Sequence, residues 1–77
     1  MLIYRQGNMF KIDESKLSSA AKNTATKNAL YAAVYDEFKG ANENPLYKSL
    51  SPIEKMNELN QFAENWLKDK VYHNGTN

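Results

Sequence analysis

The 77-residue chain has no cysteine, three glycines, two prolines and a single histidine, His73. Without cysteine no disulfide can form, and one histidine without thiolates leaves too few ligands for a structural zinc site. The glycines stand apart at positions 7, 40 and 75, so the glycine-rich loop that holds phosphate groups is missing. We therefore expect no metal ion and no cofactor.

Long apolar runs are also missing. The first twelve residues, MLIYRQGNMFKI, are interrupted by Arg5 and are too short and too polar for a signal peptide or a membrane span. We therefore expect a cytoplasmic protein without a membrane partner. Arginine occurs once, whereas lysine occurs nine times and asparagine ten times. This bias is typical of AT-rich coding sequences, such as those of a low-GC bacterium, its phages or its plasmids.

No pair of acidic side chains is placed for catalysis. Glu54 and Glu58 lie one helical turn apart, but no neighbouring residues would shield them from water as acid–base catalysis requires. Asp36 and Glu37 are adjacent and would point about 100° apart on a helix. We expect all four to be ordinary surface charges, and we predict that the protein is not an enzyme.

The small size of the chain limits its core. A domain of about this length buries only about 60% of the surface that its unfolded chain exposes. Such a core supplies roughly 3 to 5 kcal/mol unless helix packing or oligomerisation adds to it. A homodimer is therefore an alternative to a self-sufficient monomer.

The first twelve residues predict a β-hairpin over 2–12. LIYR and MFKI are short runs of apolar and aromatic residues on either side of QGN, the pattern of two strands joined by a three-residue loop. We expect strands near 2–5 and 9–12, with Ile3, Phe10 and Ile12 facing the helices. An irregular N-terminal arm is the alternative.

A helix is predicted over about 14–39. Asp13 can cap its start and Gly40 suits the left-handed position that ends a helix. The apolar stripe changes side near 23–26, where Asn and Thr weaken helix propensity, so a bend or break is expected there. The first stripe comprises Leu17, Ala21, Ala25, Ala32 and Tyr35, and the second comprises Leu30, Tyr31, Val34 and Phe38.

Two further helix starts are marked by proline. Asn44 precedes Pro45 and Ser51 precedes Pro52, which pairs a capping side chain with proline at the first helical position. They predict a short helical turn over 45–50 and a helix over 52–72, followed by a frayed tail at 73–77. The apolar arc of the last helix comprises Ile53, Met56, Leu59, Ala63, Trp66, Leu67 and Val71.

The predicted fold class follows from these elements. It is mainly α with a small N-terminal β-hairpin (α+β), in the order β-β-α-(short α)-α, as a single compact domain over 1–72. Its core is expected around Trp66, Leu67, Met56, Leu30, Val34 and Phe38.

The stretch KLSSAAKNTATKNAL, residues 16–30, is basic and contains no acid. Ammonium groups displace counterions from phosphates, and hydroxyl and amide groups donate hydrogen bonds to them. The stretch therefore permits weak, largely sequence-independent nucleic-acid binding. The candidate contacts are Lys11, Lys16, Lys22, Lys27, Ser18, Ser19, Asn23 and Thr24.

Small side chains in the same stretch also permit close packing against another protein. Ala21 and Ala25 are candidates for such an interface, together with Phe62, which projects beyond the apolar arc of the last helix. Packing within the monomer is the alternative. We favour a small accessory or regulatory protein, phage- or plasmid-encoded, that binds a protein of unknown identity, over a nucleic-acid-binding protein.

Overall fold

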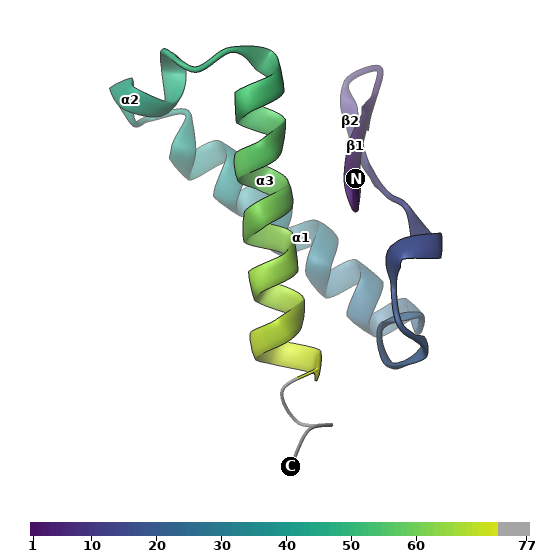
Figure 1. Ribbon diagram of the computed structural model, residues 1–77. Coiled ribbons are helices and arrows are strands. Elements are labelled where there is room, and N and C mark those ends of the chain that lie inside the picture. The colour runs from purple at the N-terminus through teal and green to yellow at the C-terminus, as the bar shows by residue number, and fades with distance from the viewer. Residues whose placement is uncertain (73–77) are drawn as a thin grey trace.

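The computed structural model describes residues 1–72 as a hairpin packed on two crossing helices (Figure 1). This arrangement confirms the predicted α+β class. The elements in chain order are β1 (Ile3–Gln6), β2 (Met9–Ile12), the 3₁₀ turns η1 (Glu14–Lys16) and η2 (Ser19–Ala21), α1 (Thr24–Ala41), α2 (Pro45–Lys48), α3 (Pro52–Leu67) and the π-helical turn η3 (Lys68–Tyr72). The predicted tail at 73–77 lies outside the described residues.

The N-terminal hairpin is present, with a shorter loop than predicted. Gln6 pairs with Met9, so the loop contains only Gly7 and Asn8. Gly7 has a φ of 62°, and no other described residue has a positive φ. A positive φ at the first loop position alone fits a type II′ turn, whose twist matches that of the flanking strands. Glycine at this position therefore fixes the register.

Side chains from the helices form hydrogen bonds with backbone groups along both outer edges of the hairpin. Asn60 of α3 accepts a hydrogen bond from the Ile3 amide at 2.7 Å and donates one to the Ile3 carbonyl at 2.8 Å. On β2, the amide of Phe10 donates to the hydroxyl of Tyr35, and that of Ile12 donates to the hydroxyl of Tyr31. The two-stranded sheet thus gains from α1 and α3 the hydrogen-bond partners that further strands would otherwise supply.

The segment between the hairpin and α1 is not the α-helix predicted from residue 14. Asp13 does act as a cap, accepting from the Ser15 amide, but it caps only the single turn η1. Leu17 and Ala21 belong to this irregular segment, and their side chains are buried in the core. Leu17 and Ala21 are four residues apart, as residues on one face of a helix are, but they do not belong to a helix. For this reason the apolar stripe predicted from them does not continue along α1.

Helix α1 begins at Thr24, where the predicted break lies. The side chain of Asn23 accepts from the Thr26 amide at 2.8 Å and caps the helix. Leu30 and Val34 of the second predicted stripe are buried. The prediction that Gly40 ends the helix is wrong, because α1 continues to Ala41 and Gly40 has no positive φ.

Replacing Gly40 with alanine should stabilise the protein. Gly40 lies within α1, and a Cβ atom built there would meet no atom within 4 Å. Alanine loses less conformational entropy on folding than glycine does, so we expect the free energy of unfolding to rise by about 0.5 to 1 kcal/mol. Urea denaturation followed by circular dichroism measures this change, and a less stable variant would contradict the assignment.

Helices α2 and α3 begin where the proline signals place them. Asn44 accepts from the Leu46 amide, and Ser51 and Glu54 form a capping box. The Ser51 amide donates to Glu54 at 3.0 Å, while the Glu54 amide donates to the Ser51 hydroxyl at 3.2 Å. Each side chain thus satisfies a backbone group of the other residue, as the sequence spacing predicts.

The capping box makes stability depend on pH. The Ser51 backbone amide, followed by its hydroxyl, lowers the pKa of Glu54 below its ordinary 4.5. A lowered folded-state pKa contributes stability above pH 4.5 that is lost as the pH falls through the folded value. We expect Glu54→Gln to be less stable than the unmodified chain near neutral pH, and the gap to close in acid. Urea titrations at several pH values measure it; a gap independent of pH would contradict this explanation.

The core lies between the hairpin and the crossing of α1 and α3. In Figure 1, α1 passes behind α3 and the hairpin stands beside them. The most deeply buried large side chains are Ile3, Leu30, Leu59 and Val34, while Trp66, Met56 and Phe38 pack against the core from its margin. Ile53 was predicted to lie on the buried apolar arc of the last helix, but its side chain is 72% exposed.

Candidate functional site

The three lysines of the basic stretch lie on different elements. Lys16 ends η1, Lys22 follows η2, and Lys27 lies in α1. The Nζ atom of Lys27 is 3.2 Å from the Glu14 carboxylate, an ion pair that offsets its charge. No single helical stripe of lysines is formed, because the stretch is not one helix.

Several polar groups of the same stretch hold the fold together. The Asn23 amide group caps α1 and also donates to the Ala20 carbonyl at 3.2 Å. The backbone amide of Ser18 donates to the Tyr72 hydroxyl and ties this segment to η3. The side chain of Asn23 is therefore engaged in hydrogen bonds within the chain. Of the other predicted contacts, Lys11 is half-buried, and Ser19 and Thr24 are exposed.

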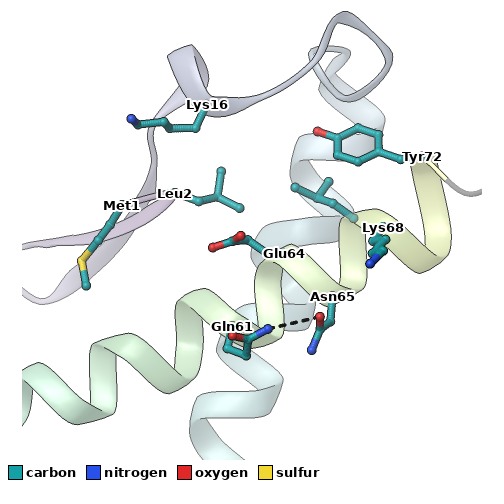
Figure 2. A pocket seen from close by; sticks show the side chains of 9 residues that line it. Met1, Leu2, Lys16, Gln61, Glu64, Asn65, Lys68 and Tyr72 are labelled. Atoms are coloured by element: carbon teal, nitrogen blue, oxygen red, sulfur yellow. Dashed lines mark hydrogen bonds between the residues drawn. The ribbon is translucent and has the colours of Figure 1, made fainter.

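Lys16 lines a cleft between η1 and the second half of α3. Figure 2 shows Lys16 on one side of this cleft and Glu64 on the other, with Leu2 between them. The cleft measures about 630 Å³. The lining also includes Lys68, so the cleft holds two cations and one acid, and Glu64 offsets part of the positive charge that would attract a phosphate.

The predicted protein-interface residues have different environments. Ala21 is fully buried in the core, so it is inaccessible to a partner of the folded chain. Ala25 is exposed at the start of α1. Phe62 is half-buried against the core, where it contributes to packing.

An apolar groove lies at the other end of α3, between the hairpin and α2. We call it the Arg5–Lys55 groove. Its volume is about 410 Å³, within the range of about 300 to 1,000 Å³ typical of ligand sites. Its rim carries two exposed apolar side chains, Ile53 at 72% and Met1 at 58%. The groove is lined by Met1, Arg5, Phe10, Phe38, Tyr47, Pro52, Ile53, Lys55, Met56 and Leu59.

Aromatic rings hold the two cations of the groove in place. The Arg5 guanidinium lies 5.3 Å from the centre of the Phe10 ring and 5.7 Å from that of Phe38. The ammonium of Lys55 lies 5.7 Å from the centre of the Tyr47 ring. Cation–π attraction therefore restrains both positive charges next to the apolar surface.

Tyr47 carries a polar group that has no hydrogen-bond partner. Its side chain is buried, and within residues 1–72 its hydroxyl is the only buried side-chain oxygen or nitrogen without a partner. Burial raises the pKa of Tyr47 above its ordinary 10.0; Glu37 and Glu58 act in the same direction and Arg5 opposes them. The hydroxyl is therefore neutral at physiological pH and costs stability.

Replacing Tyr47 with phenylalanine should stabilise the free protein. The substitution removes the unpartnered hydroxyl and keeps the ring that lines the groove. Because an unsatisfied buried group costs about 1 to 3 kcal/mol, we expect the free energy of unfolding to rise by about 1 kcal/mol. Thermal and urea denaturation measure this change. A loss of stability would show that the hydroxyl has a partner in solution.

The groove residues were not identified as a site from the sequence. Arg5 comes from β1 and Lys55 from α3, so only the folded chain brings them together. Ile53 fits the apolar spacing of α3 and was assigned to its core face. One signal was present in the sequence: Arg5 is the single arginine and ends the apolar run MLIY at the start of the sequence.

No helix among residues 1–72 is long and apolar enough to cross a membrane. In the same part of the chain, no cluster of three or more His, Cys, Asp or Glu side chains is arranged to hold a metal ion. No protein-family model matches the chain, and no curated protein or solved structure matches it significantly. The candidate site therefore depends on the geometry of the groove alone.

Proposed function

We propose that the chain is a small non-catalytic accessory or regulatory protein that acts by binding another protein through the Arg5–Lys55 groove. The observation that supports this proposal best is the apolar rim of the groove. Ile53 and Met1 are exposed at its edge, and the rings of Phe10 and Phe38 form part of its lining. Contiguous exposed apolar surface with charged side chains at its margin is typical of protein interaction sites.

The position of Ile53 strengthens this interpretation. Exposing a large aliphatic side chain gives up roughly 1.5 to 3 kcal/mol of burial, and Ile53 lies in the first turn of α3, where a polar residue would suit the helix equally well. Binding that covers Ile53 would gain this burial energy. We therefore regard Ile53 as the anchor of the interface.

Site-specific photocrosslinking tests the proposal. Benzoylphenylalanine in place of Ile53 should yield a covalent adduct with a protein in cells of the source organism, and a matched variant at Ala25 should not. Ala25 is the matched control because it is exposed and lies outside the groove lining, and because it is the exposed interface candidate from the sequence, so the pair of variants decides between the two surfaces. Adducts at both positions in equal yield, or at neither, would contradict a protein-binding role for the groove.

A further inference from the structure

The Arg5–Lys55 groove carries charge of one sign. Its lining includes two cations, Arg5 and Lys55, and no acid. Within residues 1–72 the ion pairs are Lys27 with Glu14 and Lys70 with Asp69. Both groove cations are therefore unpaired within that part of the chain and can bind an anionic group.

Resting on the proposed function, we infer that the partner presents an acidic side chain within a few residues of a large apolar one. The aliphatic or aromatic side chain would lie on Phe38, Met56 and Ile53, which line the groove and are not buried. The Asp or Glu carboxylate would bind Arg5 and Lys55. A guanidinium offers two parallel N–H groups to a carboxylate, which gives both strength and geometry.

The aromatic contacts prepare the groove for such a segment. Because Phe10 and Phe38 restrain the Arg5 guanidinium, less side-chain entropy is lost when a carboxylate binds it. Phe10 and Phe38 meet edge to face at 5.0 Å, a stable arrangement for aromatic pairs. Met56 is unbranched and adapts to apolar groups of different shape. The groove therefore combines a fixed charge with an adaptable apolar wall.

Acidic side chains next to the groove restrict where the acidic group of the partner can lie. Tyr47 and Leu59 line both the groove and a second hollow of about 470 Å³, whose lining includes Glu37 and Glu58. An acidic segment is attracted to the groove and repelled from this hollow. The acidic group of the bound segment should therefore stay in the groove with Arg5 and Lys55 and keep out of the hollow that Glu37 and Glu58 line.

Strand addition to β1 does not fit the groove. An added strand needs free amide and carbonyl groups along the sheet edge, but Asn60 already binds both of these groups of Ile3. Along the outer edge of β1, this leaves only the backbone amide and carbonyl of Arg5 for an added strand. Recognition by side chains is therefore favoured over recognition by backbone pairing.

Peptide display tests the inference. A random heptapeptide library is selected on the immobilised full chain, and the affinity of the enriched peptides is measured by fluorescence anisotropy. The selected peptides should place Asp or Glu near Leu, Ile, Met or Phe. In the double variant Arg5→Gln/Lys55→Gln, their affinity should fall by about tenfold or more, because a charge-assisted hydrogen bond contributes about 1.5 to 3 kcal/mol.

Two matched variants separate the possible outcomes. Lys39→Gln/Lys48→Gln removes two exposed cations outside the groove and should leave the affinity nearly unchanged. Ile53→Ser removes the apolar anchor and should weaken every groove-bound peptide. Circular dichroism confirms that each variant is folded.

Selected peptides without an acidic preference, weakened by Ile53→Ser but not by the Arg5/Lys55 variant, would overturn the inference and leave the proposed function standing. Peptides that none of the groove variants affects, or no selected peptide at all, would overturn both. Binding of an oligothymidylate that needs Arg5 and Lys55, without any peptide that does, would also overturn both.

Discussion

Replacing Asn60 with leucine is expected to lower the free energy of unfolding by about 2 to 4 kcal/mol. Asn60 is 6% exposed and Ile3 is fully buried, so water cannot replace their hydrogen bonds. The substitution leaves the amide and carbonyl of Ile3 unsatisfied, and each such group costs about 1 to 3 kcal/mol. A core of this size supplies roughly 3 to 5 kcal/mol, so the hairpin should detach or the whole chain unfold.

Asn57→Leu is the matched control for this substitution. Asn57 is exposed on the same helix, so the same chemical change there should alter stability by no more than about 0.5 kcal/mol. Urea denaturation followed by the fluorescence of Trp66, the single tryptophan, compares the two variants. Equal effects of the two substitutions would contradict the role of Asn60 as the link between β1 and α3.

Ala21→Glu should unfold most of the protein, whereas Ala25→Glu should not. Ala21 is fully buried, and an unpaired carboxylate at such a position costs several kcal/mol. We expect a loss of about 3 kcal/mol or more, close to the whole stability of a small core. Ala25 is exposed in the first turn of α1, where a negative charge favours the helix dipole.

The helical signal in circular dichroism measures this contrast at once. A folded Ala21→Glu variant would show that Ala21 is accessible, as its interpretation as an interface residue requires. Unfolding by Ala25→Glu would show that the first turn of α1 is buried in solution.

Local signals in the sequence were enough to predict most of the helix starts. The starts of α2 and α3 are marked by Asn44 with Pro45 and by Ser51 with Pro52. The capping contacts there join residues close together in the sequence, so they do not depend on the rest of the fold. The same holds for the hairpin, whose two short strands meet at Gly7. Leu30 and Val34 were predicted as core because α1 is a regular helix through both positions.

The start of α1 was misplaced for a physical reason. Leu17 and Ala21 have helical spacing, but Leu17 is an extended residue just after η1 and Ala21 is the last residue of η2. Both are buried. The chain has ten asparagines, and nothing local distinguishes Asn60, which is buried, from the others. Its role depends on Ile3, at the other end of the sequence, and became evident only from the fold.

The groove could not be predicted because its parts are distant in the sequence. Its two cations lie on β1 and α3, and its rings come from β2, α1 and α2. Charge counting along the chain favoured the basic stretch 16–30 instead. In the fold, Lys27 is paired with Glu14, and the cleft that holds Lys16 and Lys68 also holds Glu64. Arg5 and Lys55, in contrast, share a groove whose lining has no acid.

Chemical-shift mapping tests the central claim most directly. An acidic, apolar peptide from the display selection is titrated into the ¹⁵N-labelled chain, and the backbone amide shifts are followed by NMR. The account predicts that the largest shifts fall on Arg5, Phe38 and Met56, which line the groove. Shifts confined to Lys16 and Glu64, in the cleft of Figure 2, would contradict it.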